Sequence, residues 1–136
     1  MPTLITDNIA EVLIKIIEFT QVRQKILARN INNIHTGGFM PEDLEVDEFS
    51  EVLHDAICEH TRSRRLLLRD TENIKFGAFG SFEVKPTIDK YAEEILERSL
   101  DEYLELQINK LLENAINQRV AAELLRQRER TVSIFE

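Results

Sequence analysis

The stretch that decides the fold is DNIAEVLIKIIEFTQVRQKILARNINNIHTGGF, residues 7–39. Its apolar residues recur at spacings of three and four, the periodicity of one face of an α-helix. Two neighbouring rows follow this spacing: Ile9, Val12, Ile16, Phe19 and Ile26 in one, and Leu13, Ile17, Leu27, Ile31 and Ile34 in the other. The pattern predicts an N-terminal helix over residues 4–36 with a heptad-like seam, capped by Thr6 or Asp7.

Two polar residues fall in the first of these rows. Arg23 and Asn30 continue its spacing, so they are expected to point into the seam. A polar residue there weakens packing but fixes the register and the choice of partner, and Arg23 requires a carboxylate or carbonyl opposite it. The alternative is that Asn30 faces solvent and that the asparagines simply end the helix. Gly37 or Gly38 is expected to close the helix with a positive φ.

The middle of the chain predicts a second helix and a small β element. The helix is expected over residues 45–70, and one of its faces gathers apolar residues: Phe49, Val52, Leu53, Ala56 and Ile57. Residues 73–86 alternate apolar and polar side chains around a glycine-rich centre, which is typical of a hairpin. We expect its glycines to form the turn and Phe79 and Phe82 to pack.

A long C-terminal helix is predicted over residues 88–131. Its heptad row is apolar except at Gln118, which interrupts it: Leu104, Ile108, Leu111, Ala115, Ala122 and Leu125. A single helix cannot bury such a row alone, so each terminal helix needs the other one or a second subunit as its partner. We therefore expect one mainly α domain, residues 1–136, whose terminal helices form a bundle or coiled coil, and we expect it to form homo-oligomers.

Composition excludes several classes of function. The chain of 136 residues carries a net charge of −8, so it is a poor general ligand for nucleic acid or anionic membrane. Its apolar runs are too short to cross a bilayer, and the N-terminus lacks the features of a cleaved signal peptide. The single cysteine, Cys58, excludes an internal disulfide.

The stretch HDAICEH, residues 54–60, is the strongest candidate for a metal or catalytic site. His54 and Cys58 lie four residues apart on one helix face, but a structural zinc site needs four ligands and no second pair follows. Two adjacent turns of one helix also do not build an oxyanion hole. We expect Cys58 to be buried or half-buried and the chain to have no catalytic, metal or cofactor site.

Motifs near the two ends give a more specific indication. The first comprises Arg23, Gln24, Leu27, Ala28, Asn30, Ile31, Asn33, Thr36, Gly38 and Phe39, followed by the acidic segment DLEVDEF at residues 43–49. The second is ENAINQRVAAELL, which begins with Glu113, Asn114 and Ala115. In this order and at these ends, the two motifs resemble the terminal signatures of bacterial flagellar rod and axial proteins, and the chain length is similar to that of the small proximal-rod members.

This resemblance implies a structural role. Such a protein would be a subunit of the flagellar basal-body rod, with no enzymatic activity and no cofactor. It would be made in the cytoplasm, leave it unfolded through the flagellar type III export apparatus, and assemble in the periplasm. Its partners would be other rod proteins and the base of the export gate, contacted through the residues of the two motifs.

A second resemblance lies in the middle segment. IKFGAFGSFEVK, residues 74–85, is similar to the strand turn of HU-type DNA-bending proteins. The basic arm that follows in those proteins is replaced here by PTIDKYAEEILERSLDE, whose acids would repel phosphate. We interpret the segment as a β-hairpin whose similarity to HU-type proteins is convergent. An HU-like architectural DNA-binding protein and a helical oligomeric scaffold of another role are the alternative functions.

Overall fold

The computed structural model describes residues 7–134, apart from the side chains of Phe79 and of residues 132–134. The α-helices are α1 (Asn8–Asn32), α2 (Val46–Ser63), α3 (Lys90–Arg98) and α4 (Leu100–Ile134). The strands are β1 (Glu42–Asp43), β2 (Ile74–Phe76), β3 (Phe82–Val84) and β4 (Thr87–Ile88). The predicted fold class, mainly α with long terminal helices and a small hairpin, is confirmed.

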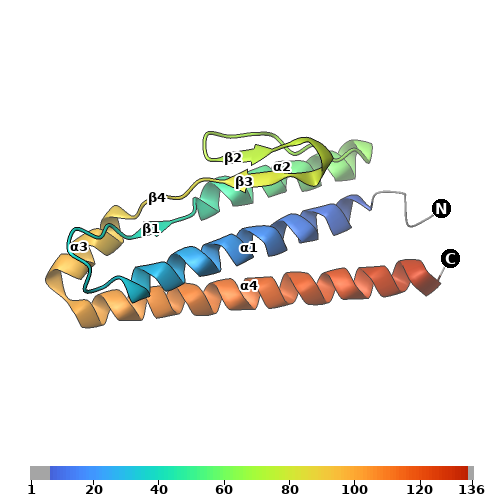
Figure 1. The fold of residues 1–136 in the computed structure, drawn as a ribbon. Helices are drawn as coiled ribbons and strands as arrows, with labels where there is room; N and C mark the ends of the chain where they lie inside the picture. Colours follow the sequence, from blue (N-terminus) through green and yellow to red (C-terminus); the bar gives the residue numbers. More distant parts are fainter. Residues whose placement is uncertain (1–6, 135–136) are drawn as a thin grey trace.

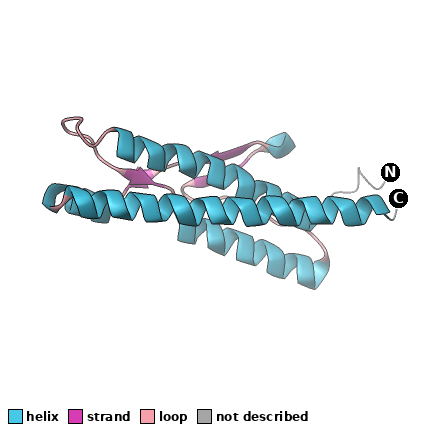
Figure 2. Ribbon diagram, turned by 90° about the horizontal axis from the view of Figure 1, so that it is seen from below, coloured by secondary structure: helices cyan, strands magenta, loops and turns pink. Residues whose placement is uncertain are grey.

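The helix α1 lies at the centre of the molecule. On one side it runs antiparallel to α4, which is the most extensive contact between two elements (Figure 1). On its other side lie α2 and the β2–β3 hairpin, and α3 forms the end of the molecule remote from both termini (Figure 1). Seen from below, α4 extends across the whole front of the molecule (Figure 2).

The start of α1 agrees with the sequence, whereas its end does not. The Asp7 side chain accepts a hydrogen bond from the Ile9 backbone N–H at 3.2 Å, as predicted for the N-cap. Residues 4–6 of the predicted helix lie outside the described residues. The helix ends at Asn32 rather than at 36, because the Asn33 side chain donates to the Arg29 carbonyl at 2.9 Å and competes with further helical hydrogen bonds. Gly38 has a φ of +75°, but it lies in the following turn, so the prediction of a glycine cap was wrong.

The helix α2 begins near the predicted position and stops earlier, at Ser63. Arg64 takes the left-handed conformation, with a φ of 62°, and ends the helix. Residues 65–70 form no regular element; Leu66 and Leu68 pack against the core while Leu67 between them is exposed. Helix prediction failed here because periodicity cannot assign so short an apolar run to a helix or to another conformation.

The predicted hairpin is confirmed. β2 and β3 pair antiparallel, and the turn between them includes Gly80 with a φ of +80°. A Cβ on Gly77 would overlap the Ser81 hydroxyl, so a larger residue there would require the Ser81 side chain to move. The Phe82 ring packs against Phe49 of α2, and the hairpin therefore lies against the helices. The packing predicted for Phe79 lies outside the described side chains.

The predicted C-terminal helix over residues 88–131 is divided in the structure. Its first residue, Ile88, belongs to β4, which pairs with β1, and α3 is then separated from α4 at Ser99. Ser99 has an extended backbone and its hydroxyl accepts the Glu102 backbone N–H at 3.3 Å, which caps α4. The single long helix was therefore the wrong prediction, because a capping serine in the middle of it starts a new helix.

The apolar core is formed mainly between α1, α2 and the hairpin. Phe19 and Phe49 stack at 4.0 Å between ring centroids, and Val12, Ile26 and Ile74 are buried with them. A smaller cluster forms where α3 meets the start of α4. Within residues 7–134 no helix is long and apolar enough to cross a membrane.

Candidate functional site

Polar side chains line the contact between the two terminal helices. We define the polar seam as Thr20 and Asn30 of α1 together with Tyr103, Gln107 and Asn114 of α4. All five are buried. The three α4 residues follow the heptad spacing of four and then seven, so they form one row along α4.

The apolar row predicted for this helix lies about 100° further around it, one residue on from the buried row. Ile108, Ala115 and Ala122 of that row are exposed rather than buried against α1. These three positions of the predicted row are therefore left open in a single chain, whereas Leu104, Leu111 and Leu125 of the same row are half-buried.

Asn30 holds the centre of the polar seam. Its side-chain amide donates to the Glu42 carbonyl at 2.7 Å and to Gln107 Oε1 at 3.0 Å. Its side-chain oxygen accepts the Glu42 backbone N–H at 3.1 Å. One asparagine thus joins α1, β1 and α4, and the prediction that Asn30 points into a seam is confirmed.

Two further hydrogen bonds connect α4 to the backbone of α1. The Asn114 amide donates to the Thr20 carbonyl at 2.8 Å, and the Tyr103 hydroxyl donates to the Asn30 carbonyl at 2.9 Å. Burial, and to a smaller degree the charge of Asp89, raises the pKa of Tyr103 to about 12. The phenol therefore remains a neutral donor over the whole physiological range.

A cluster of four charges lies beside the polar seam. We call Arg23, Asp43, Asp89 and Lys110 the charge cluster. The Arg23 guanidinium binds both carboxylate oxygens of Asp43, at 2.8 and 3.0 Å. Lys110 Nζ bridges Asp43 at 2.9 Å and Asp89 at 2.6 Å. The carboxylate that the sequence required opposite Arg23 is thus Asp43, and the two positive charges balance the two negative ones.

The neighbouring charges favour the ionised forms of Asp43 and Lys110. Burial alone would raise the pKa of Asp43, but hydrogen bonds and positive charge, first from Arg23 and then from Lys110, hold it below its usual value. Burial would lower the pKa of Lys110, but the two carboxylates, first Asp89 and then Asp43, raise it. Asp89 also caps α3 by accepting the Ala92 backbone N–H at 3.1 Å. The cluster therefore connects α1, β1, α3 and α4.

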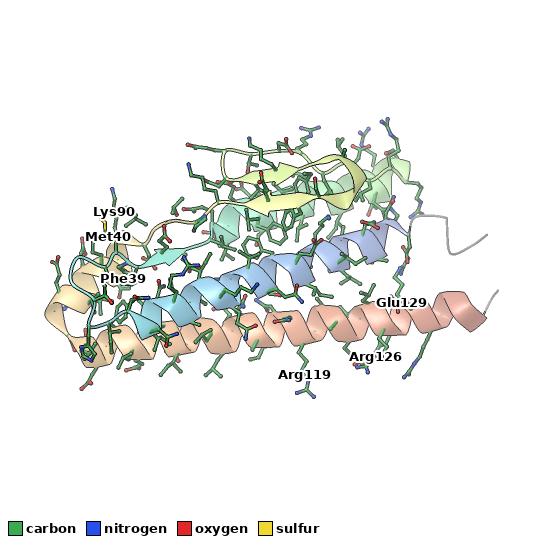
Figure 3. All side chains as sticks on the ribbon, viewed as in Figure 1. Phe39, Met40, Lys90, Arg119, Arg126 and Glu129 are labelled. Carbon is green, nitrogen blue, oxygen red and sulfur yellow. The ribbon has the colours of Figure 1, made fainter. Side chains whose placement is uncertain are left out.

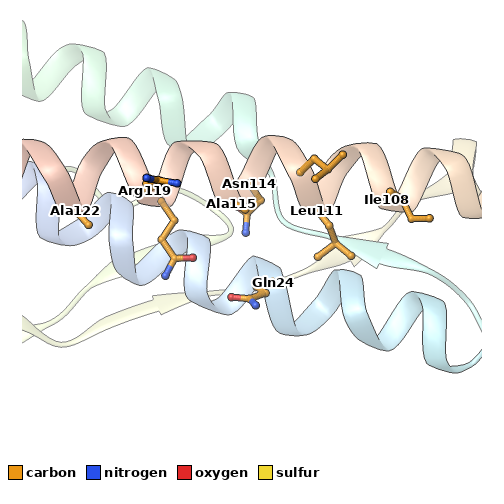
Figure 4. Close-up of a pocket in the computed structure, with 9 residues that line it drawn as sticks. Gln24, Ile108, Leu111, Asn114, Ala115, Arg119 and Ala122 are labelled. Carbon is orange, nitrogen blue, oxygen red and sulfur yellow. The ribbon is translucent and has the colours of Figure 1, made fainter.

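The structure separates the predicted site residues into a buried and an outer group. Arg23, Leu27, Asn30 and Asn114 are buried, and Ile31, Asn33 and Phe39 are half-buried. Gln24, Thr36, Gly38, Glu113 and Ala115 are exposed. Of these, Gln24 and Ala115 line a shallow groove along the outer side of the α1–α4 contact (Figure 4).

Sequence reasoning missed the α4 side of the site. Tyr103, Gln107 and Lys110 were not predicted, although together with Asn114 they follow a regular spacing of four, three and four. This polar heptad row was the available signal. It was overlooked because the apolar row beside it fits the usual pattern of a buried seam better.

The prediction for Cys58 was wrong, because the residue is exposed. Its sulfur lies 3.6 Å from Nε2 of His54, one turn earlier on α2, and Ile57 beside it is exposed as well. Among the described residues, no three His, Cys, Asp or Glu side chains gather as a metal site would require.

Comparison of the chain with protein-family models, with curated proteins and with solved structures found no match. The functional interpretation depends on the residues and the geometry described above. The polar seam and the charge cluster bind segments of this chain to one another. Buried amides and ion pairs are costly to desolvate but discriminate strongly between registers, so the arrangement can fix how α1 lies against α4.

Proposed function

We propose that this protein is a structural subunit of the bacterial flagellar basal-body rod, similar to the proximal-rod protein FlgB. One observation carries the proposal: residues of both terminal motifs and of the acidic segment lie along one contact, which joins α4 to α1 and β1. Arg23 and Asn30 come from the N-terminal motif, Asp43 from the acidic segment and Asn114 from the C-terminal motif. Asn30 and Asn114 both belong to the polar seam, and Arg23 binds Asp43 beside it.

This convergence gives the motif residues a physical role. Each motif alone is a short pattern in a helix, but their buried polar groups have partners only when α1 and α4 lie in one register. A subunit that stacks repeatedly through its terminal helices needs this uniqueness, because an error in register would be passed on to every neighbour.

The outer surface of α4 also supports assembly. Large apolar side chains remain exposed along most of its length: Ile108, Leu112, Ile116, Val120 and Leu124. A helix that is apolar on several faces is normally buried by neighbours. In the proposed rod these neighbours are other rod proteins, further copies of the chain and the base of the export gate. The protein would reach them through type III export and would have no enzymatic activity or cofactor.

Gene deletion in the source bacterium tests the proposal. Without the protein, cells should not swim, and isolated basal bodies should lack the rod in electron micrographs. A plasmid copy of the wild-type gene should restore both, and the tagged protein should copurify with basal bodies. A deletion strain that swims normally with complete basal bodies would show that the chain is a helical scaffold of another role.

A further inference from the structure

One side of α4 is apolar at its centre and charged at its ends. We define the outer face as Asp101, Glu105, Ile108, Leu112, Ala115, Arg119, Arg126 and Arg130, which are all exposed. Ile108 and Leu112 are 49% and 58% exposed, and no other element covers α4 in the view from below (Figure 2). Arg119 and Arg126 point away from α1 (Figure 3). The outer face is therefore open along its whole length.

Four of the five charges on the outer face are arranged symmetrically about its centre, and the fifth, Arg119, falls opposite Leu112. Asp101 and Glu105 precede the apolar centre, and Arg126 and Arg130 follow it. The midpoint between Glu105 and Arg126 falls between Ala115 and the next residue, and so does the midpoint between Asp101 and Arg130. A reversed copy of α4 would thus place each acid opposite an arginine.

We propose that the outer face binds a second copy of this chain, with the two α4 helices antiparallel about a two-fold axis beside Ala115. Glu105 then faces Arg126 of the other copy, and Asp101 faces Arg130. In a parallel pair, each of these charged residues would instead lie beside the identical residue of the other copy, and like charges repel. Charge complementarity thus selects the antiparallel arrangement and its register, and Leu112 is covered by the aliphatic stem of Arg119 from the other copy.

The size of the face indicates a dimer that depends on concentration. A helix of 35 residues is about 50 Å long. A strip about 10 Å wide along it buries about 1,000 Å² in total, which is near the lower limit for a specific interface. A two-fold contact of this kind is closed, so this face alone joins two copies and adds no third one. The inference does not depend on the proposed rod function.

Cysteine cross-linking of the full chain tests the arrangement. In a Cys58→Ser background, Ala115→Cys places the two sulfurs beside the two-fold axis, and mild oxidation should give a covalent dimer. Ala122→Cys, an exposed alanine on the same side of α4, is the matched control. Its two copies would lie about 20 Å apart in the antiparallel pair, so it should not cross-link. Equal cross-linking at both positions would indicate a parallel pair, and none at Ala115→Cys would likewise overturn the proposal.

Sedimentation velocity over a range of concentrations tests the charges. The wild type should pass from monomer to dimer, and Arg126→Glu should weaken dimerisation by about tenfold or more because it faces Glu105. The double variant Glu105→Arg, Arg126→Glu should restore the dimer. These positions are too far apart within one helix to interact, so only a contact between copies explains such a rescue. A wild type that stays monomeric, or a double variant as weak as the single one, would refute the arrangement.

Discussion

Replacing Asn30 by leucine separates two opposite expectations. From the sequence alone, an apolar residue should pack a helical seam better and leave stability unchanged or raise it. The structure predicts the reverse, because the Asn30 side chain is 1% exposed and makes three hydrogen bonds. Asn30→Leu should therefore destabilise the fold.

The change in the free energy of unfolding follows from the groups that lose their hydrogen-bond partner. These are the Glu42 N–H, the Glu42 carbonyl and Gln107 Oε1. Gln107 is completely buried, whereas Glu42 is half-buried and partly reached by water. A buried polar group left without a hydrogen-bond partner costs about 1–3 kcal/mol, so the three groups together cost about 4 kcal/mol. The buried leucine returns about 1–2 kcal/mol. The free energy of unfolding should fall by about 2–3 kcal/mol, which corresponds to a Tm lower by about 6–15 °C.

Urea unfolding followed by circular dichroism at a fixed protein concentration measures this change. Asn32→Leu is the matched control, since Asn32 is exposed at the end of the same helix and should change stability by less than about 0.5 kcal/mol. In Asn30→Leu, Gln107→Leu both amides are replaced, so the double variant should lose less than the sum of the single losses. An Asn30→Leu protein as stable as the wild type would refute the reasoning about the polar seam.

Further predictions concern the charge cluster, single buried and exposed side chains, and DNA binding. Asp43→Asn should lower the free energy of unfolding by about 3 kcal/mol in urea titrations, because it leaves buried Arg23 without its carboxylate. The pKa of Asp43 is lowered in the folded state, so its contribution is present above its ordinary value of 3.8 and is lost as the pH falls through the folded-state value. Acid unfolding of the wild type should show this loss, and Asp43→Asn should not. Leu27→Ala should cost about 2–5 kcal/mol by thermal melting, since Leu27 is completely buried, while exposed Cys58→Ala should change stability by less than about 0.5 kcal/mol. The purified protein should not retard duplex DNA at moderate salt; tight, salt-sensitive binding would favour the HU-like alternative.

The sequence by itself determined the elements whose signals are local. Asp7 is a capping residue directly before a periodic apolar run, so the start of α1 could be read from it. Gly80 marked the hairpin turn, because its φ of +80° is a conformation that residues with a side chain rarely adopt. The heptad spacing also showed that Arg23 and Asn30 are turned inward, because position along a helix fixes the direction of a side chain.

The tertiary structure decided which partner each buried face meets. Periodicity shows that a face is buried but not which element buries it. The ion pairs of Arg23 with Asp43 and of Lys110 with Asp89 therefore could not be predicted from the sequence. On α4, a polar and an apolar row lie one residue apart, and both have heptad spacing. The polar row faces α1 because Asn114 and Tyr103 donate to α1 backbone carbonyls and Gln107 Oε1 accepts from Asn30, although the buried Gln107 Nε2 has no partner. An apolar row in its place would leave the Asn30 amide without Gln107.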